Sequence, residues 1–317
     1  MTDVAHRYVQ AGAIRMHIAE AGSGPLVILL HGFPESWYSW RHQLVALAAA
    51  GYHAVAPDQR GYGRTDRPDA VEDYTILHTV GDVIGLIDAL GEEQAVVAGH
   101  DWGAGVAWHS ALMRPDRIRA VIGLGAPQGP RPTTSPLATM RENAGENFYI
   151  AYLQRPGVAD QELQRDPRTT IRRALYGASG EGYPWHPVVP EGGGLLDTWS
   201  EPEQLPGWLS EEDLDIYAAE FERTGFTSAL NWFRNLDRNW ALTAPWHNAA
   251  VQPPALYLTG DRDTASALPG GKELIAGTST VVPNLRKAIV LPGCGHWTQQ
   301  ERPAEVNEAL ISFLRSL

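Results

Sequence analysis

The chain of 317 residues contains a single cysteine, Cys294. One cysteine cannot form a disulfide within the chain, and it excludes a metal site built from several cysteines. No apolar run approaches the ~18 residues that a membrane-spanning helix needs, and the N-terminus lacks a basic region followed by an apolar stretch. We therefore expect neither a signal peptide nor a membrane segment, and a cytoplasmic location.

Positive charge is also scarce in this chain. The formal net charge is −12, and Lys272 and Lys287 are the only lysines among its 25 basic residues. Because the sequence has no blocks of Lys or Arg, we expect it to bind neither nucleic acid nor an anionic membrane surface. The acidic balance indicates solubility and points to small molecules as partners.

What the sequence does contain is an alternation of strand and helix patterns. A probable hairpin around Val9–Ala19 precedes this alternation. Short apolar runs, typical of buried strands, occur at Pro25–Leu30, His53–Asp58, Ala95–Gly99, Ala120–Gly125, Pro254–Gly260 and Ala288–Gly293. Helical spacing is found at Ser36–Ala48, Tyr74–Leu90 and Trp102–Met113, and again from Pro303. This order predicts an α/β fold with a mostly parallel central sheet flanked by helices.

The alternation is interrupted in the middle of the chain. Residues 128–248 contain helical patches and a Pro/Gly-rich loop at Tyr183–Gly207, without strand runs. We therefore expect residues 1–127 and 249–317 to form one core. A mainly helical cap, residues 128–248, would be inserted after the sixth strand of that core.

A tight corner carries the first chemical signal. The stretch GHDWG, residues 99–103, lies between an expected strand and an expected helix. This small-x-nucleophile-x-small pattern is typical of a nucleophile elbow, with Asp101 as the exposed residue. The alternative is that Asp101 only caps the following helix, which is a common role for aspartate.

Three further stretches favour a catalytic role for Asp101. HGFP follows the first core strand, GDRD (residues 260–263) follows a later one, and GCGHW (residues 293–297) follows the last. The order nucleophile, acid, histidine is that of an α/β-hydrolase. Asp101, Asp263 and His296 each follow the carboxyl end of a strand, where open α/β sheets bind ligands. The sequence therefore predicts a catalytic triad of these three residues.

A family resemblance emerges from these motifs together with the insert. Over nearly its full length the chain resembles the soluble epoxide hydrolases of the α/β-hydrolase superfamily. The matching stretches are HGFPESWYSWRHQL, GHDWGA, YLQRPGVA, GFTSALNWFRN and GCGHWTQ. HGFP and GHDWG alone also suit haloalkane dehalogenases, whereas the stretches in the insert favour epoxides. The resemblance implies an α/β-hydrolase fold with a helical cap.

The aspartate nucleophile itself indicates the kind of electrophile. Attack by a carboxylate on a saturated carbon forms an ester, which water can cleave at Cγ of Asp101. His296 would activate that water, and Asp263 would orient the imidazole. The backbone N–H groups of Phe33 and Trp102 match the family's oxyanion hole. The family pattern also leads us to expect a cis Phe33–Pro34 peptide bond.

Opening an epoxide also requires a proton donor for the alkoxide. Relatives in this family use two cap tyrosines, and Tyr149 matches the first of them. The second position holds Phe233, which has no hydroxyl group. Our hypothesis is that Tyr149 is the main acid and that activity persists. The alternatives are that the Trp232 indole substitutes for the missing donor, or that the protein is impaired or repurposed.

Several further residues are assigned to the site on weaker grounds. The expected pocket lining indicates an apolar epoxide, although each member could instead pack in the core. This lining consists of Trp37, Tyr152, Trp232, Phe233 and Trp297. Glu35 and His100, beside the catalytic residues, either order the hydrolytic water or form local structural hydrogen bonds.

Two other functions remain open at this stage. A haloalkane dehalogenase would use the same Asp-His-Asp triad, and a ligand receptor could retain the fold without turnover. No cofactor is expected, since GYGRTDRP is not a phosphate loop and no cluster has metal-ligand spacing. The expected partners are an epoxide and water, and the oligomeric state stays open, a homodimer included.

Overall fold

The computed structural model describes residues 3–267 and 271–317. These residues form one eight-stranded sheet in the order β1-β2-β4-β3-β5-β6-β7-β8. The strands are β1 (Ala5–Ala11), β2 (Ile14–Ala21), β3 (Leu26–Leu30), β4 (His53–Pro57), β5 (Ala95–His100), β6 (Ile118–Leu124), β7 (Ala255–Gly260) and β8 (Leu285–Leu291). Strand β2 pairs antiparallel with β1 and β4, and the remaining pairs are parallel. The mostly parallel sheet predicted from the sequence is therefore confirmed.

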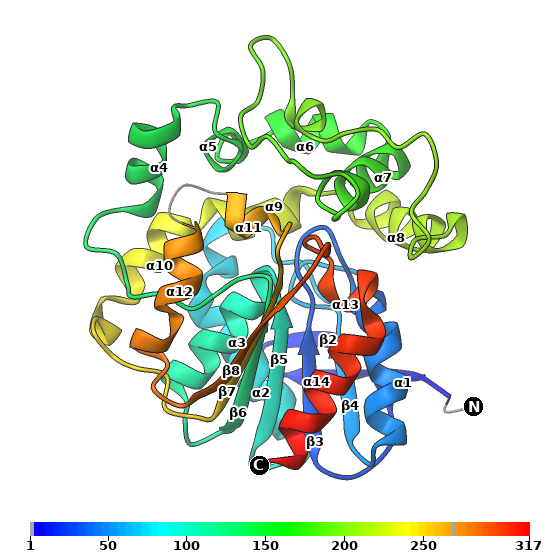
Figure 1. Ribbon diagram of the computed structural model, residues 1–317, viewed down its shortest axis with the longest axis vertical. Coiled ribbons are helices and arrows are strands. Elements are labelled where there is room, and N and C mark those ends of the chain that lie inside the picture. The colour runs from blue at the N-terminus through cyan, green and yellow to red at the C-terminus, as the bar shows by residue number, and fades with distance from the viewer. Residues whose placement is uncertain (1–2, 268–270) are drawn as a thin grey trace.

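Helices cover both faces of this sheet (Figure 1). The core helices are α1 (Arg41–Ala49), α2 (Ile76–Ala89), α3 (Trp102–Met113), α11 (Thr264–Ala267), α12 (Gly271–Val281), α13 (Thr298–Glu301) and α14 (Pro303–Arg315). Side chains alternate between the faces along each strand. In β3, Val27 and Leu29 pack in the cluster that includes residues of α1 and α14, whereas Ile28 and Leu30 belong to the cluster of α2 and α3. This double burial explains the continuous apolar runs.

The insert between β6 and β7 is helical. It contains α4 (Pro136–Ala144), α5 (Tyr149–Leu153), α6 (Val158–Gln164), α7 (Pro167–Gly177), α8 (Glu211–Thr224), α9 (Thr227–Arg234) and α10 (Leu236–Leu242). In Figure 1, α4 to α8 lie above the carboxyl ends of the parallel strands, and α9 lies between them and the core. Helix α10 lies lower in this view and packs against α2, where its Asn239 Oδ1 accepts a hydrogen bond of 2.8 Å from the N–H of Ile76.

Some of the expected features agree with the structure in detail, whereas others differ. Helix α3 has the predicted bounds, and the Phe33–Pro34 bond is cis, as expected. Strand β8 begins three residues before the predicted Ala288, because an edge strand has exposed positions that shorten its apolar run. Helix α12 was not predicted. Within the described ranges, no helix combines the length and apolar character needed to cross a bilayer.

Candidate active site

Asp101 occupies a sharp turn between β5 and α3. Its backbone has φ 53° and ψ −120°, a conformation that residues other than glycine rarely adopt. The flanking glycines are required by close packing. A Cβ atom at Gly99 would lie 2.0 Å from the carbonyl oxygen of Gly103, and one at Gly103 would lie 2.2 Å from that of Leu30. The turn therefore explains why small residues flank the aspartate.

The Asp101 carboxylate does not cap α3. Its side chain makes no capping hydrogen bond to the helix, and Oδ1 instead accepts a bond of 2.9 Å from the Phe33 N–H, across the end of the sheet. The N–H of Trp102 is the first amide of α3, directly after Asp101. Helix N-termini favour negative charge, so this corner suits a carboxylate and an oxyanion. The helix-cap alternative is thus disfavoured by the geometry.

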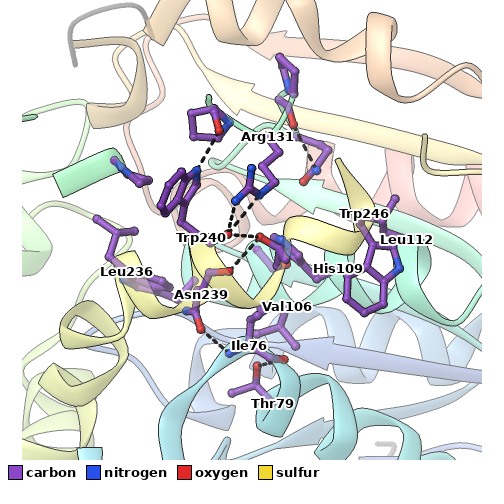
Figure 2. A pocket seen from close by; sticks show the side chains of 18 of the residues that line it. Ile76, Thr79, Val106, His109, Leu112, Arg131, Leu236, Asn239, Trp240 and Trp246 are labelled. Atoms are coloured by element: carbon purple, nitrogen blue, oxygen red, sulfur yellow. Dashed lines mark hydrogen bonds between the residues drawn. The ribbon is translucent and has the colours of Figure 1, made fainter. Parts of the chain in front are cut away.

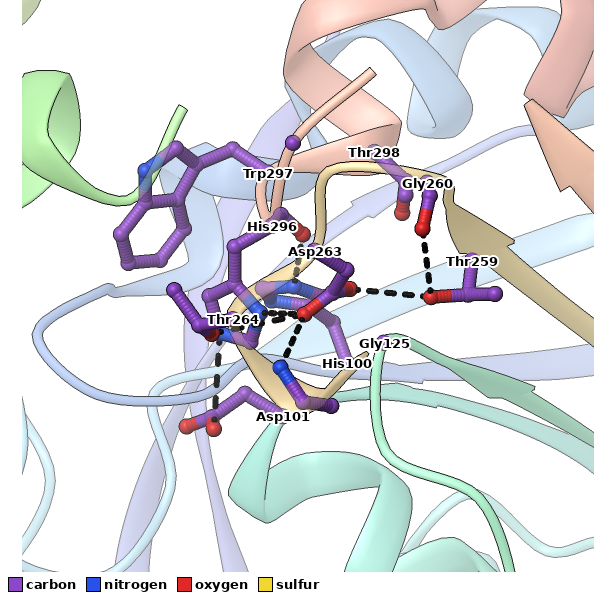
Figure 3. A network of polar contacts seen from close by, with 12 residues as sticks. His100, Asp101, Gly125, Thr259, Gly260, Asp263, Thr264, His296, Trp297 and Thr298 are labelled. Atoms are coloured by element: carbon purple, nitrogen blue, oxygen red, sulfur yellow. Dashed lines mark hydrogen bonds and ion pairs between the residues drawn. The ribbon is translucent and has the colours of Figure 1, made fainter. Parts of the chain in front are cut away.

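The three predicted triad residues lie together at the carboxyl edge of the sheet (Figure 3). His296 Nε2 lies 3.5 Å from Asp101 Oδ2, and His296 Nδ1 lies 2.9 Å from Asp263 Oδ1. Asp263 is fully buried, and Thr259 at the end of β7 donates a bond of 3.1 Å to its Oδ2. The loops after β5, β7 and β8 supply these side chains. Residues far apart in sequence converge because parallel strands end at the same edge.

Charge is concentrated among these residues. Burial tends to raise the pKa of the Asp101 carboxyl, but the hydrogen bond and charge of His296 outweigh this effect and hold the pKa below its ordinary value. Burial alone would lower the pKa of His296, yet Asp263 and Asp101 keep it well above its usual range. Both shifts favour the charged forms, a carboxylate at Asp101 and an imidazolium at His296 between two carboxylates.

Glu35 and His100 form a buried brace beneath the triad. Glu35 Oε2 lies 2.7 Å from His100 Nδ1 and accepts a bond of 2.8 Å from the Gly32 N–H. The other ring nitrogen, His100 Nε2, lies 2.8 Å from the carbonyl oxygen of His296. These contacts link the HGFP loop to the histidine loop. They favour the structural alternative for both residues over the ordering of water.

The residues after His296 complete this brace, and the sequence analysis did not identify them. Glu301 accepts hydrogen bonds from the N–H groups of Gly180, Gly295 and Trp297, at 3.0, 2.9 and 3.0 Å. The side-chain amides of Gln299 and Gln300 donate to Glu35 Oε1. The signal available in the sequence was the polar run TQQE directly after the GCGHW motif.

Tyr149 comes from the cap. It is the first residue of α5, and its N–H donates a bond of 2.8 Å to the Pro187 carbonyl. The ring packs edge-on against Phe148 and Trp185, with centroids 5.0 and 4.9 Å apart. Burial raises the pKa of Tyr149, and the negative charge of Asp101 raises it further. No described residue hydrogen-bonds to the Tyr149 hydroxyl group.

Comparison with known proteins agrees with this geometry. A family model described as the alpha/beta hydrolase fold matches residues 25–169. The chain is 45% identical to epoxide hydrolase A of Mycobacterium tuberculosis, over 98% of this chain and 97% of that protein. It also resembles the crystal structure of epoxide hydrolase A from Mycobacterium thermoresistibile, with a TM-score of 0.93 and 47% identity over 99% of this chain and 98% of that one. The chain belongs to the epoxide hydrolase family.

Plant members of the family are similar as well. Epoxide hydrolase 1 of Siraitia grosvenorii is 43% identical over 99% of both chains. The structure of epoxide hydrolase VrEH1 from Vigna radiata has a TM-score of 0.92 and 41% identity over 99% of both chains. These relatives match the cap as well as the core. The similarity therefore includes the cap, whose sequence stretches favour an epoxide hydrolase over a haloalkane dehalogenase.

Two residues assigned to the pocket of this epoxide hydrolase have structural contacts. The Tyr152 hydroxyl donates a bond of 2.7 Å to Glu162 within the cap, and the Arg155 guanidinium lies over its ring. The Trp37 ring packs edge-on against His6 of β1, with centroids 4.6 Å apart. These contacts favour structural roles for both side chains, and their assignment to the pocket stays a prediction.

The other assigned aromatic residues do surround the site of this family member. Phe233 lies edge-on to Phe33 and Trp102, with centroids 5.3 and 4.9 Å apart. The Trp297 ring covers His296 at 4.8 Å. Trp232 faces Trp102 at 6.4 Å, but its indole N–H donates a bond of 3.1 Å to the Arg60 carbonyl. The Trp232 indole is therefore already engaged, which argues against it as the replacement donor.

Metal chemistry has no visible support in the described part of the chain. Among residues 3–267 and 271–317, no group of three or more His, Cys, Asp or Glu side chains has the arrangement of a metal site. The site that the structure does provide is one of acids, an imidazole and backbone N–H groups.

Proposed function

We propose that this epoxide hydrolase converts an apolar epoxide into a vicinal diol through a covalent ester on Asp101. The observation that carries this proposal is the arrangement of the Asp101 carboxylate, with one oxygen held by a backbone N–H and the other facing the imidazole. A carboxylate held in this way is oriented for attack by one defined oxygen. The aromatic rings around it favour an apolar substrate.

In the first step, Asp101 Oδ2 attacks a ring carbon of the epoxide. Oδ1 is already engaged with the Phe33 N–H, so Oδ2 is the available nucleophile. An ester C–O bond forms while the ring C–O bond breaks, and the released electron pair goes to the epoxide oxygen. Tyr149 gives its hydroxyl proton to that oxygen. The charge that raises the pKa of Tyr149 disappears as the ester forms, which makes the proton easier to release.

In the second step, water attacks Cγ of the esterified Asp101. The imidazolium of His296 first restores the proton of Tyr149 and becomes neutral, since alkylation has removed one of the charges that raised its pKa. Neutral His296 then takes a proton from water. The N–H groups of Phe33 and Trp102 stabilise the oxyanion on Oδ1. Cleavage of the Cγ–Oδ2 bond releases the diol, whose new hydroxyl takes its proton from His296. The proton left on the re-formed Asp101 carboxyl then passes to His296, which restores the starting carboxylate and imidazolium.

A single turnover in ¹⁸O-water tests this route. The protein is used in molar excess over styrene oxide. The masses of the diol and of the peptide that contains Asp101 are then measured by mass spectrometry. We expect ¹⁸O in the Asp101 carboxylate and unlabelled oxygen in the first diol, because water attacks Cγ rather than the substrate carbon. Label that enters the first diol directly would contradict the covalent route.

A halide assay separates the remaining alternative. A haloalkane dehalogenase would release chloride from a chloroalkane with the same triad, and it would not depend on a phenol. We expect diol formation from styrene oxide and no chloride release from 1-chlorobutane under the same conditions. Chloride release without diol formation would overturn the proposed substrate class.

A further inference from the structure

A cavity of about 450 Å³ lies between α3, α10 and the loop that contains Arg131, and Trp102 is part of its lining (Figure 2). The mechanism described above makes no use of it. Its walls are mainly apolar and aromatic, with Val106, Leu112, Trp240 and Trp246 among them. Neither Asp101 nor His296 lines the cavity, so its relation to the reaction has to be derived from the elements that it shares with the site.

Helix α3 provides the connection to the nucleophile. The cavity is bordered by Trp102, Gly105, Val106, His109 and Leu112. Residues at these spacings share one face of a helix, and that face begins at Trp102, directly after Asp101. A ligand bound to Asp101 that extends past Trp102 would therefore run along α3. Asp101 and His109 are eight positions apart, which corresponds to about 12 Å along the helix axis.

Gly105 leaves space open on this helix face. A Cβ atom built at Gly105 would meet no other atom within 4 Å. Glycine weakens a helix relative to alanine by about 1 kcal/mol, so its presence here is not explained by the helix itself. The missing side chain widens the cavity between Trp102 and His109.

His109 offers a hydrogen-bond acceptor to this cavity. Its Nδ1 lies 2.7 Å from the Gly105 carbonyl oxygen, so Nδ1 must carry the proton and donate it. Burial lowers the pKa of His109, which favours the neutral ring. In the neutral tautomer with the proton on Nδ1, Nε2 holds a lone pair. No described residue supplies a donor to that nitrogen.

Three other polar side chains in the lining have hydrogen-bond partners within the protein. The Arg131 guanidinium donates bonds of 3.1 and 2.6 Å to the Trp240 carbonyl, and the Trp240 indole donates one of 2.8 Å to Pro132 (Figure 2). The Tyr74 hydroxyl donates to Pro68 at 2.6 Å. A methyl group placed against His109 would remove Nε2 from water without replacing the lost hydrogen bond, whereas a hydroxyl group would satisfy it.

We propose that this cavity binds the distal part of the substrate and that His109 selects epoxides with a hydrogen-bond donor, such as a hydroxyl group, at the far end of an apolar chain. The inference rests on the proposed reaction at Asp101 for the position of the epoxide ring. The selection by His109 defines a narrower class of substrates than the triad, because the triad would contact only the epoxide ring.

Binding of the diol products tests the selection independently of turnover. Alkane-1,2-diols of increasing length are prepared in two series, one ending in a hydroxyl group and the other in a methyl group. Their dissociation constants are measured by calorimetry for the wild type and for His109→Phe, which retains an aromatic ring but removes the acceptor. The ratio between the series should favour the hydroxyl group about tenfold more in the wild type than in the variant.

Three further variants define the outcome. His109→Leu provides the same test if His109→Phe does not fold, as judged by thermal unfolding. His109→Gln should recover part of the preference, because its amide oxygen can accept a hydrogen bond. The exposed His186, which does not line the cavity, supplies the matched control His186→Leu, and we expect it to retain the wild-type ratio.

The cavity itself is tested by Gly105→Leu, whose side chain should fill it. We expect both series of long diols to bind at least tenfold more weakly to this variant. Unchanged binding to Gly105→Leu, or an unchanged ratio in both His109→Phe and His109→Leu, would overturn the inference. Failure of the proposed function would be visible elsewhere, as absence of ¹⁸O from Asp101 in the wild type, and would leave the binding ratios readable.

Discussion

The carboxyl edge of the sheet and the cap hold their functional side chains in different ways. At the sheet edge, Asp101, Asp263 and His296 contact one another and the N–H groups of neighbouring loops, and Asp263 is fully buried. In the cap, the Tyr149 ring is held by two aromatic neighbours, while no described residue hydrogen-bonds to its hydroxyl. In the proposed mechanism, the core would thus fix the nucleophile and the base before substrate arrives, and the cap would contribute the proton donor.

The comparison extends to how each region is stabilised. The core brace of Glu35 and His100 links two catalytic loops directly. Within the cap, pairs such as Arg234 with Asp160, at 2.5 Å, and Tyr152 with Glu162 hold neighbouring helices together. Substitutions at the sheet edge should therefore abolish chemical steps, whereas substitutions in the cap should change their rate or specificity.

The largest effect is expected at the nucleophile. Asp101→Ala removes the carboxylate that forms the ester, so kcat/KM for styrene oxide should fall by about 10⁴-fold or more. The exposed Asp116, paired with Arg114 away from the site, provides the control Asp116→Ala with activity near that of the wild type. Turnover by Asp101→Ala within tenfold of the wild type would mean that the sheet edge does not supply the nucleophile.

The second prediction distinguishes ester formation from ester hydrolysis, the two steps proposed for the side chains at the sheet edge. His296→Gln removes the base, so hydrolysis of the ester should slow by roughly 10²- to 10⁴-fold while alkylation of Asp101 continues. Intact-protein mass spectrometry after addition of styrene oxide should then show the variant accumulating one substrate mass. An inactive variant that never gains this mass would contradict the assigned division of labour.

A pH dependence sharpens the role of Asp263. The neutral form of His296 acts as base, so hydrolysis of the ester should rise with pH through the pKa of His296. Asp263 raises that pKa, and Asp263→Asn should therefore move the midpoint of the rise to lower pH while reducing the maximal rate by about 10²-fold. Quenched-flow measurement of ester decay across pH provides the test, and a midpoint shifted to higher pH would contradict it.

In the cap, the expected effect is smaller and confined to ring opening. Tyr149→Phe removes the proton donor, so ester formation should slow by about 10²-fold, with less change in ester hydrolysis. Single-turnover kinetics resolve the two rates. Equal slowing of both steps would indicate a general disturbance of the site rather than loss of an acid.

The smallest effect on activity is expected at the other tyrosine of the same helix. Tyr152→Phe removes a hydroxyl that bonds Glu162, so it should lower the free energy of unfolding by about 1 kcal/mol. Turnover should remain close to that of the wild type, which makes this variant the matched control for Tyr149→Phe. Denaturant unfolding and steady-state kinetics measure the two quantities, and a large loss of turnover would remove the distinction between these tyrosines.

Much of the core could be predicted because its signals are local. Strands buried on both faces appear as continuous apolar runs, and α3 ends before Pro115 as a proline requires. The elbow glycines are needed for close backbone contacts, so their spacing around Asp101 was informative. Asp263 and His296 each follow a strand. This was sufficient to predict that they lie close together, since the carboxyl ends of parallel strands lie at the same edge of the sheet.

The cap was less predictable from its residues alone. Tyr149 and Tyr152 lie close together on α5, yet the Tyr149 ring packs against Phe148 and Trp185, whereas the Tyr152 hydroxyl bonds Glu162 within the cap. The Trp232 indole was a reasonable replacement donor until its bond to Arg60 was visible. Likewise, nothing in the sequence indicated that Trp37 packs on β1 or that Gly105 and His109 border a cavity.

The sequence by itself determined the order of strands and helices, and it predicted the three residues of the proposed triad with the aspartate as nucleophile. These features depend on periodicity, backbone sterics and the chemistry of single residues, all of which can be identified in short stretches of the sequence. The tertiary structure alone decided which aromatic side chains face the site, what Glu35 and His100 bond to, and where the cavity lies. Those features depend on contacts between distant segments, whose relative orientation only the packed chain defines.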